Sequence, residues 1–444
     1  MEDRSLRPRS HAVIAGGGVA GLLAVAALAS FFKRVTLVER DGTNTGGGAR
    51  RGVPQGRHAH ALLPRGLAAL EELFPGFTRR AIDRGAVAGN AAADVSWGVG
   101  GVRLAGAADT LPVIVSTRPF LEDEIRRHVA PLENVTLIDR ARVSDFVHKG
   151  SSVTGVVLER EAPGTDERLE AELVIDATGR ASRLPAWLAA HGFAPPAEET
   201  MEVDVGYATA RYAADPQRLG GRRALLVGAT PGCSRGGVVH AVEGDMIEVS
   251  LTGYRNEHPP ATRAGFVAHA ASLALPDIHR LIHDAEPCSE IVTFRVAQTV
   301  RRHYHKAKRL PSGLLALGDA VCAFNPVFAQ GMTVAALEAL ALRESLREAG
   351  SRVLDSGFVR RFYRRSAAAL APAWQMARGN DLMVPHLAHH ASPVDRLMSR
   401  WIGRVLLAGA RDPEVARRFM RIASLVDGPA ALFAPPLVAR VLRT

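Results

Sequence analysis

Hydrophobic residues along this chain of 444 residues follow two different periods, and each period predicts its own kind of element. The apolar run at 11–15 leads into GGGVAG at 16–21 and an alanine-rich run at 22–30, and another apolar run follows at 35–40. This order predicts a strand, a glycine turn, a helix and a second strand, which together begin a βαβ unit. The same criteria predict helices at 65–74 and 118–130 and strands at 135–139, 142–160 and 171–176.

Apolar and polar residues alternate through much of the next third of the chain, in MEVDVGYATARY at 201–212, GGVVHAVEGDMIEVSLTG at 236–253 and SEIVTFRVAQTV at 289–300. Alternation over such lengths predicts an antiparallel sheet. Beyond residue 342 the pattern is helical, with arginine-rich faces. The sequence therefore predicts an α/β fold with a Rossmann-type dinucleotide-binding domain, an antiparallel β-sheet domain and a helical C-terminal region.

Composition narrows the class of protein. A hydrophobic content of 47% can bury a large core, and the length exceeds that of one usual domain. The three cysteines, Cys233, Cys288 and Cys322, are widely spaced without a CxxC pair, which favours a reducing compartment. The start lacks a signal-peptide pattern, and no run of about 18 uncharged apolar residues occurs. We therefore expect a cytoplasmic protein without stable membrane insertion.

The net charge of +10 is compatible with a polyanionic partner. Its distribution argues against nucleic acid, because only four basic residues are lysines and the arginines are scattered in pairs without interleaved aromatic residues. A loosely bound acidic partner or substrate stays open as an interpretation of this charge.

Gly16, Gly18 and Gly21 have the GxGxxG spacing directly after a predicted strand and before a predicted helix. In this context glycine lets a pyrophosphate approach backbone N–H groups at a helix N-terminus. Glu39 ends the second strand, where a carboxylate can accept hydrogen bonds from the ribose hydroxyls of an adenosine. The alternative is purely structural, with glycines for close helix–strand packing and an exposed acid at a strand end.

The stretch LLALGDAVCAFNPVFAQGMTVAALEALAL at 314–342 favours a flavin over a nicotinamide cofactor. Asp319 follows a buried run, where its carboxylate can accept a hydrogen bond from a ribityl hydroxyl. The next helix is delayed until about Gly331 and Met332, so its positive end can face a flavin ring that becomes anionic on reduction. Pro326 would form a flat wall without a donor beside this ring. The alternative is that Asp319 caps a core helix.

These segments together resemble known flavoenzymes. GGGVAG, Glu39, DATGR at 176–180 and GDAVCAFNPVFAQGM at 318–332 are similar to the motifs of FAD-dependent monooxygenases of the p-hydroxybenzoate hydroxylase-like fold. Within that group, RGVPQGRHAHALLPRG at 51–66 and STRPFLEDEI at 116–125 are most similar to bacterial epoxidase-like flavoenzymes of polyether and polyketide antibiotic biosynthesis. The last hundred residues resemble the family only in being helical.

The resemblance implies a role for each residue that matches these motifs. The first glycine turn would bind the pyrophosphate, Arg118 would reach the flavin phosphate or ribityl chain, and Val143 would contact adenine through its backbone. The polar segment at 41–60, which we call the arm, carries Arg51, Gln55 and His58. These residues would flank the flavin, or the arm would merely cap the domain. The predicted FAD-binding residues are Gly16, Gly18, Val19, Ala20, Gly21, Glu39, Arg40, Arg51, Gln55, His58, Arg118, Val143, Gly179, Asp319, Pro326, Gly331 and Met332.

Departures from neighbouring families limit the chemistry. Asp176 is followed by Ala-Thr-Gly, whereas the aromatic hydroxylases have Asp-Gly, so no nicotinamide role is assigned to this motif. Flavin halogenases carry a Trp-x-Trp-x-Ile-Pro segment and an essential lysine. The segment that begins at Trp97 does not match, and no lysine lies between Lys33 and Lys149. Halogenation is therefore not expected.

Two other kinds of site are also not expected. His58 and His60 could share one face of a strand, but no third ligand with suitable spacing stands out, so we predict no metal site. There is no GxSxG elbow, and neither Cys233 nor Cys322 has an obvious base nearby, which argues against covalent catalysis. The sequence assigns no catalytic residue.

We therefore predict an FAD-dependent monooxygenase, an epoxidase or hydroxylase, that passes one oxygen atom of O₂ to a carbon–carbon double bond or an electron-rich ring. NAD(P)H or a flavin reductase would supply the electrons. The alternative is a cyclase that keeps FAD as a bound scaffold without net redox chemistry, because every motif above serves FAD binding. The predicted parts are a discontinuous FAD-binding domain (1–90, 108–190 and 290–345), a substrate-binding β-sheet domain (91–107 and 191–289) and a helical C-terminal region (346–444).

The substrate is expected to be a large, mostly apolar molecule of bacterial secondary metabolism, held between the flavin and the antiparallel sheet. On the strand at 203–211, alternate residues share a face that ends in a hydroxyl and a guanidinium. Tyr207 and Arg211 on this face are the predicted substrate contacts. The alternative is that the face forms the core of its own lobe, with Arg211 reaching to solvent.

Overall fold

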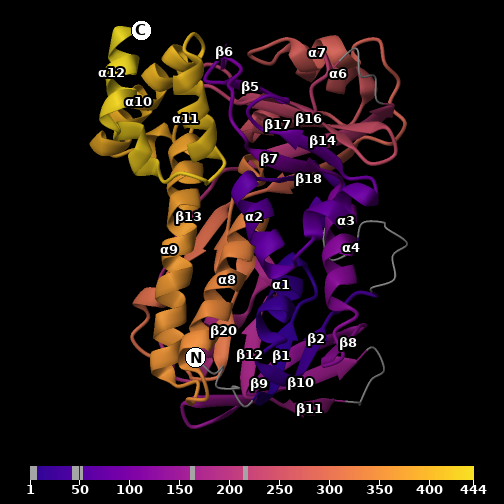
Figure 1. Cartoon of the computed structure of the whole chain (residues 1–444), viewed down its shortest axis with the longest axis vertical. Coiled ribbons are helices and arrows are strands. Elements are labelled where there is room, and N and C mark those ends of the chain that lie inside the picture. The colour runs from indigo at the N-terminus through magenta and orange to yellow at the C-terminus, as the bar shows by residue number, and fades with distance from the viewer. Residues whose placement is uncertain (1–7, 43–49, 51–53, 161–165, 214–218) are drawn as a thin grey trace.

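The computed structural model in Figure 1 describes residues 8–42, 50, 54–160, 166–213 and 219–444. The molecule is elongated. A parallel sheet lies at one end, a larger sheet lies at the other end, and long helices run between them along one side (Figure 1).

The parallel sheet has the strand order β20-β12-β1-β2-β8, and all four pairings are parallel. Its central strand β1 pairs Val13 with Thr36 on one side and with Val174 on the other. The strands are apolar and largely buried because both faces of a parallel sheet are normally covered. Their bounds are β1 Arg9–Ala15, β2 Phe32–Val38, β8 Val135–Ile138, β12 Leu173–Asp176 and β20 Leu314–Ala316.

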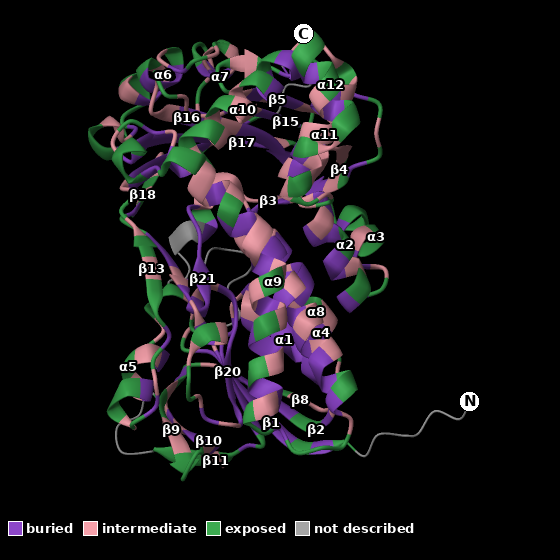
Figure 2. Cartoon of the chain, turned by 90° about the vertical axis from the view of Figure 1, so that its left-hand side faces the viewer, coloured by how far each residue is buried: buried purple, intermediate pink, exposed green. Residues whose placement is uncertain are grey.

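Helix α1 (Val19–Leu28) is apolar on every side, and its surroundings explain why. It packs on the parallel sheet and also against α4 (Arg118–Val129) and α8 (Gly331–Ala349), so no face of it needs to be polar. Helix α8 in turn contacts α2 (Pro64–Leu73) and α9 (Ser356–Asp381). Figure 2 shows buried strands near β20 beside helices that also carry intermediate and exposed residues.

Three small sheets surround this core. One has the order β11-β10-β9, one β13-β19-β21 and one β3-β7-β4. Their bounds are β9 Ala141–Lys149, β10 Ser152–Arg160, β11 Glu167–Glu170, β13 Glu198–Met201, β19 Thr299–Arg302, β21 Cys322–Ala323, β3 Ala61–Leu62, β7 Pro112–Val115 and β4 Val87–Asn90. The short helices α3 (Phe77–Asp83) and α5 (Leu184–Ala190) lie at opposite edges of the view in Figure 2.

The larger sheet has seven strands in the order β18-β14-β17-β16-β15-β5-β6, and only β15 and β5 pair in parallel. Residues Ala208, Ala210 and Tyr212 on one face of β14 pack with α6 (Arg263–Ala271) and α7 (Asp277–Ile282) to form the core of this lobe. The strand bounds are β5 Val95–Val99, β6 Val102–Arg103, β14 Val205–Ala213, β15 Ala224–Val227, β16 Arg235–Val242, β17 Met246–Tyr254 and β18 Val292–Val296.

The other face of β14, which we call the inner face, carries Val205, Tyr207, Thr209 and Arg211. Val205 and Tyr207 pack with Val384 and Leu387, which follow α9. The same buried cluster contains Val203, Tyr254 and Val296 of this lobe, so the substrate role of the inner face and its structural alternative both stay predictions.

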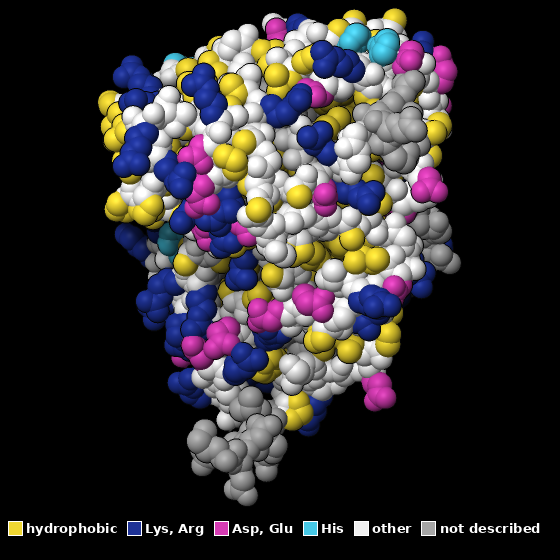
Figure 3. Space-filling view, turned by 45° about the horizontal axis from the view of Figure 1, so that its top comes forward, with side chains coloured by type: hydrophobic (Ala, Val, Ile, Leu, Met, Phe, Trp, Pro, Cys, Tyr) yellow, Lys and Arg dark blue, Asp and Glu magenta, His cyan; other side chains and the backbone are white. Residues whose placement is uncertain are grey.

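The C-terminal region continues from α9 into α10 (Pro393–Gly409), α11 (Pro413–Ala423) and α12 (Pro435–Arg443), and these helices share a small core. Residues 346–444 contain sixteen arginines against seven Asp or Glu residues, an excess of nine positive charges in a chain whose net charge is +10. The basic composition is thus concentrated in this region. On the face shown in Figure 3, Lys and Arg side chains are distributed among hydrophobic and acidic ones.

The predicted α/β fold class is confirmed, including the start of α8 at Gly331. All three cysteines are free thiols. Within the ranges given above, no helix is both long enough and apolar enough to cross a membrane. The residue bounds of the three predicted domains stay a prediction.

Candidate FAD site

The first glycine turn contains two kinds of glycine. Gly16 has a φ of 102°, and a Cβ there would lie 2.5 Å from the carbonyl oxygen of Ala177, while a Cβ on Gly21 would lie 1.8 Å from that of Gly16. Both glycines are therefore required by the protein's own backbone. At Gly18 a Cβ would meet, among the described atoms, only Arg50 Nη2 at 3.9 Å. The space in front of Gly18 is the space that a pyrophosphate would need.

Glu39 lies beside this space with its carboxylate held by the backbone. The residue is only 5% exposed, which rules out the alternative of an exposed strand-end acid. Its Oε2 accepts from Gly17 N at 2.7 Å and its Oε1 from Asp41 N at 2.9 Å. A carboxylate fixed in this way can take the ribose hydroxyls of an adenosine.

Arg50 is a site residue that the sequence did not predict. Its guanidinium is buried, lies 2.8 Å from Glu39 Oε2, donates to Glu122 Oε1 at 2.6 Å and donates to the Gly17 carbonyl oxygen at 3.3 Å. Burial acts to raise the pKa of Glu122, but the charges of Arg118 and Arg50 bring that pKa below its ordinary value. The guanidinium of Arg50 therefore places a buried positive charge where the phosphates of a dinucleotide would approach.

Arg118 begins α4 and supplies a second positive charge. Burial lowers the pKa of its guanidinium, while the carboxylates of Glu122 and Asp319 act against this shift. Its Nε is buried without a hydrogen-bond partner in the part of the chain that the structure describes. A buried unpaired N–H is costly, and a phosphate or ribityl oxygen would satisfy it. The donor set here fits the phosphate-bearing half of FAD.

Asp319 lies in the 3₁₀ turn Gly318–Ala320 (η5), directly after β20. Its carboxylate is 33% exposed, and Oδ2 lies 3.4 Å from Arg180 Nε. A Cβ on Gly331 would lie 3.9 Å from Asp319 Oδ1, which places the start of α8 beside this acid. The N-cap of α8 is Gln330, so Asp319 does not cap that helix. The carboxylate stays available to a ribityl hydroxyl.

The turn that carries Asp319 is fixed from behind by buried polar groups. Glu338 of α8 accepts from Gly318 N at 2.8 Å and from Ser366 Oγ at 2.6 Å, and burial raises the pKa of Glu338 to about 7. Arg302 of β19 donates to the carbonyl oxygen of Ala320 at 3.1 Å. These contacts fix the backbone of the turn and do not involve the Asp319 carboxylate.

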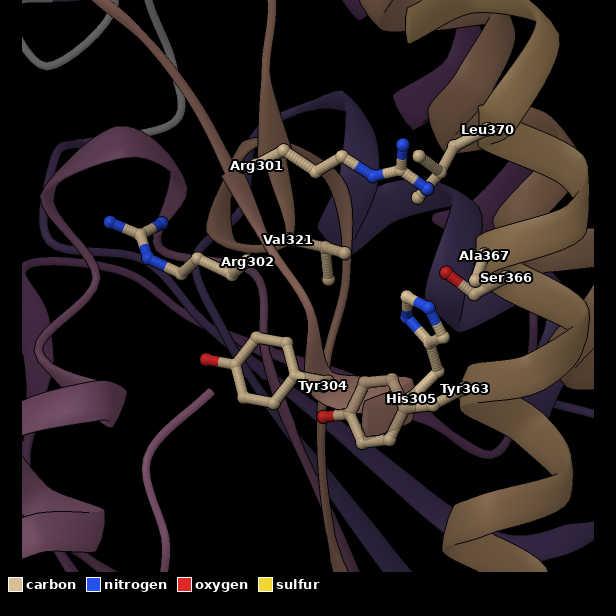
Figure 4. Close-up of a pocket in the computed structure, with 9 residues that line it drawn as sticks. All are labelled: Arg301, Arg302, Tyr304, His305, Val321, Tyr363, Ser366, Ala367 and Leu370. Carbon is tan, nitrogen blue, oxygen red and sulfur yellow. The ribbon is translucent and has the colours of Figure 1, made fainter. Parts of the chain in front are cut away.

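A separate small pocket lies behind this turn, between β19 and α9 (Figure 4). The rings of Tyr304 and Tyr363 stack in its wall with centroids 4.8 Å apart. Its lining residues are Arg301, Arg302, Tyr304, His305, Val321, Tyr363, Ser366, Ala367 and Leu370. None of the predicted FAD-binding residues is among them. We therefore assign this pocket to the packing behind the turn and not to the FAD site.

Asn325 ties the next turn, which carries Pro326, to distant parts of the chain. Its side-chain oxygen accepts from Tyr207 OH of β14 at 3.1 Å, and its amide nitrogen donates to Tyr254 OH at 3.0 Å and to Asp381 Oδ1 at 2.7 Å. Burial raises the pKa of Asp381 to about 7. The turn predicted to lie beside the flavin ring is thereby attached to both the seven-stranded sheet and α9.

His58 of the arm lies on the inner face of that sheet. His58 Nδ1 is 2.8 Å from Thr209 Oγ1, and its ring centroid lies 5.9 Å from that of Tyr207 and 5.7 Å from that of Phe294. Burial lowers the pKa of His58 to about 4, so the ring is neutral at physiological pH. Arg51 and the side chain of Gln55 lie outside the described part of the chain.

Arg211 lies at the polar end of the inner face. Its side chain is 40% exposed, and its Nε donates to Glu248 Oε2 at 3.1 Å. Burial raises the pKa of Glu248 to about 7, and His240 Nε2 lies 3.8 Å from Glu248 Oε1. The inner face therefore has an apolar half around Tyr207 and a titratable half around Glu248.

The remaining predicted residues lie around the same two turns or beside them. Ala20 lies against Gly318, where an added Cβ would come within 2.6 Å of it. Val143 lies on β9, whose first residue Ala141 donates its N–H to the Glu39 carbonyl oxygen at 3.1 Å. Val19 and Met332 are buried, Gly179 is half-buried and Arg40 is exposed. No group of three potential metal ligands occurs among the residues that the structure describes.

The fold and this site define a dinucleotide-binding flavoprotein, and comparisons with known proteins agree. The family model "FAD dependent oxidoreductase" matches residues 12–202. The chain is 31% identical over 459 residues to Protein Rv3254 of Mycobacterium tuberculosis (strain ATCC 25618 / H37Rv), covering 100% of this chain and 95% of that protein. The chain belongs to the FAD-dependent oxidoreductase family; it is a flavin-dependent oxidoreductase, and its cofactor is FAD.

Solved structures share the fold at low sequence identity. The flavin-dependent brominase Bmp2 is 14% identical with a TM-score of 0.70, covering 98% of each chain. The p-nitrophenol 4-monooxygenase PnpA of Pseudomonas putida DLL-E4 is 18% identical with a TM-score of 0.66, covering 95% of this chain and 99% of that one. The Diels-Alderase PyrE3 is 17% identical with a TM-score of 0.62, covering 94% and 81%. Identities this low establish the shared fold alone.

Proposed function

We propose that the chain is a monooxygenase, an epoxidase or hydroxylase, that acts on a large, mostly apolar small molecule of bacterial secondary metabolism. One observation carries the proposal: Tyr207 of the inner face donates to Asn325, at the start of the turn that we place beside the flavin ring. Val205 and Tyr207 are buried in a cluster against which Phe294 and Val327 of this turn pack, and these residues would form an apolar surface for a bound molecule. An apolar substrate would lie between that surface and the ring, at a junction of two lobes.

The chemistry requires few groups from the protein. In the proposed reaction O₂ takes two electrons from reduced FAD; one oxygen atom enters the substrate, and the other leaves as water with two protons. The glycine turn, Glu39, Arg118 and Asp319 would hold the cofactor. The inner face and His58 would orient the substrate and exclude water from the ring. An olefin needs no side-chain base, which suits a Tyr207 hydroxyl already donated to Asn325.

Proteins that share this fold support a monooxygenase. PnpA is named a monooxygenase and shares this fold over nearly its whole length. The similarity of the arm and of STRPFLEDEI to polyether and polyketide epoxidase-like enzymes supports an olefinic substrate. Electrons would come from NAD(P)H or from a flavin reductase acting as a partner. The alternative is a non-redox cyclase, and PyrE3, named a Diels-Alderase, shares the fold.

Oxygen dependence separates the two functions. We expect NAD(P)H, with a flavin reductase if needed, to bleach the visible band of the bound flavin, and air to restore it within seconds. With a panel of olefinic polyketides, product should form only in air and carry one atom of ¹⁸O from ¹⁸O₂. Product formed without O₂ while the flavin band stays unbleached would instead establish the cyclase.

The inner face is tested by Tyr207→Ala and Arg211→Ala, with Tyr207→Phe as the matched control. Loss of the Tyr207 ring should lower turnover about ten-fold, because a substrate misplaced by even ~1 Å reacts far more slowly. Tyr207→Phe removes only the hydrogen bond to Asn325 and should keep most of the turnover. FAD content should change little in all three. The melting temperature should change little in Tyr207→Phe and Arg211→Ala, but it should fall in Tyr207→Ala because that ring is buried. A large loss of stability, with full activity per folded molecule, would show that these residues have a structural role and do not contact the substrate.

A further inference from the structure

Asp381 is a buried carboxyl at the end of α9, far in the sequence from every predicted cofactor residue. Its Oδ1 accepts two hydrogen bonds, from Asn325 Nδ2 at 2.7 Å and from Tyr254 OH at 3.0 Å. Asn325 and Tyr254 are themselves nearly completely buried. A buried acid with two such donors is an arrangement that costs stability unless every partner is in place.

The donors and acceptors of this network are mutually consistent. Asn325 donates to Tyr254 and to Asp381, and its oxygen accepts from Tyr207 OH and from Val327 N at 3.2 Å. Tyr254 accepts from Asn325 and donates to Asp381. The side chain of Asn325 is therefore fixed in one orientation by groups from β14, β17 and α9, all outside the turn that it begins.

The turn after Asn325 needs such a fixed starting point. Ala329 has a φ of 52°, in the left-handed region that residues other than glycine rarely adopt, and the Gln330 side-chain oxygen has no partner among the described residues. Val327 N is held by Asn325 itself. The conformation of residues 326–330 thus depends strongly on where Asn325 stands.

We propose that Asp381 is a positioning residue of the cofactor site, which fixes Asn325 and through it the turn at 325–330 against the flavin ring. The inference rests on the placement of the ring at this turn, proposed above, and does not depend on oxygen transfer. No motif points to Asp381, because its role comes from a contact across the fold.

The charge of Asp381 gives this role a pH signature. Burial raises the pKa of the carboxyl to about 7, while the hydrogen bonds from Asn325 and Tyr254 act in the opposite direction. The titratable groups that face it are Tyr254 from β17 and Tyr207 from β14, and burial keeps the pKa of both well above its ordinary value. Arg180 lies near Tyr207, and the His386 ring lies 6.0 Å from that of Tyr254.

The sign of the effect follows from these pKa values. Between about pH 4 and pH 7 the folded protein keeps a proton on Asp381 that the unfolded chain has lost, so this group makes stability fall as pH rises through that window. Above about pH 7 the buried carboxyl becomes charged, and the cost of removing that charge from water outweighs its two hydrogen bonds. The turn is therefore held less tightly above pH 7 than below it.

The test compares the holoenzyme with Asp381→Asn and Asp381→Ala, measuring the FAD dissociation constant and the visible flavin spectrum from pH 5.5 to 8.5. In the parent protein both readouts should change with a midpoint near pH 7. Asp381→Asn keeps an acceptor for Asn325 and Tyr254, so affinity should stay within about three-fold and the midpoint should disappear. Asp381→Ala should weaken FAD about ten-fold at every pH, as loss of a buried hydrogen bond does.

Two further variants, Gly331→Ala and Tyr254→Phe, serve as controls for the place of the flavin ring and for folding. Gly331→Ala adds a Cβ that the protein tolerates, 3.9 Å from Asp319 Oδ1, so a shifted flavin spectrum in this variant reports the ring beside α8. If that shift occurs while Asp381→Ala keeps the parent affinity, spectrum and pH midpoint, the positioning role is wrong. If Gly331→Ala leaves the flavin spectrum unchanged, the ring lies elsewhere and the inference is wrong. Should Asp381→Ala not fold, Tyr254→Phe replaces it and should weaken FAD while keeping the midpoint.

Discussion

Gly18→Val is expected to abolish FAD retention while the protein still folds. A Cβ at Gly18 meets nothing closer than Arg50 Nη2 at 3.9 Å among the described atoms, so the apoprotein can accept a larger side chain there. The isopropyl group would occupy the space assigned to the pyrophosphate, and the backbone N–H groups of the turn could no longer be approached. The purified variant should be colourless, whereas the parent protein should be yellow and release FAD, not FMN, on denaturation.

The matched control is Gly106→Val, because Gly106 is exposed, has no positive φ and has nothing within 4 Å of an added Cβ among the described residues. This control should be yellow, with the parent melting temperature after removal of FAD. Gly18→Val should share that apoprotein melting temperature. A yellow Gly18→Val protein would place the pyrophosphate away from the GxGxxG turn.

Asp319→Ala should weaken FAD by about 1 to 3 kcal/mol, or roughly 5- to 150-fold, as expected when a hydrogen-bonding partner is removed from a partly buried site. The expected cause is the loss of the acceptor for a ribityl hydroxyl. Helix α8 should be unaffected, because its N-cap is Gln330. The FAD dissociation constant of the reconstituted apoprotein measures the effect.

Arg180→Ala separates the charge pair from the cofactor contact. It removes the partner 3.4 Å from Asp319 Oδ2 but leaves the carboxylate in place, so FAD affinity should fall much less than in Asp319→Ala. Equal losses in the two variants would mean that the ion pair, rather than a bond to the ribityl chain, explains the role of Asp319. Unchanged affinity in Asp319→Ala would remove this residue from the site.

The sequence predicted those parts of the fold that have a local signal. The apolar strands around a glycine turn predicted β1, α1 and β2, and the delayed helix predicted the start of α8 at Gly331. The alternation at 201–212 predicted the two faces of β14, although the sequence left open which of them is the core of its lobe. In the structure both faces are buried, because Ala208 and Tyr212 pack on α6 and α7 while Tyr207 packs in a second cluster on the opposite side.

The parts that escaped prediction are contacts between residues far apart in the chain. Arg50 binds Glu39 and Glu122, and Asp381 binds Asn325, yet no spacing or period in the sequence links these residues. A carboxylate near a helix end or a guanidinium in a connecting segment looks, in the sequence, like a solvent-facing charge. Only the burial of these side chains shows that they do not face solvent. That burial depends on the packing of α9 and α4 against the rest of the molecule.

The strand order of the parallel sheet has a consequence for how the protein is made. β1 leaves the ribosome early, but its neighbour β12 ends at Asp176 and the edge strand β20 ends at Ala316. The hairpin partners β16 and β17 are close in sequence, so their lobe can pair sooner than the parallel sheet. Asp319, α8 and α9 come last in the sheet's half of the molecule. During synthesis the adenosine half of the cofactor site is therefore present well before the flavin half, and FAD can be captured fully only by a nearly finished chain.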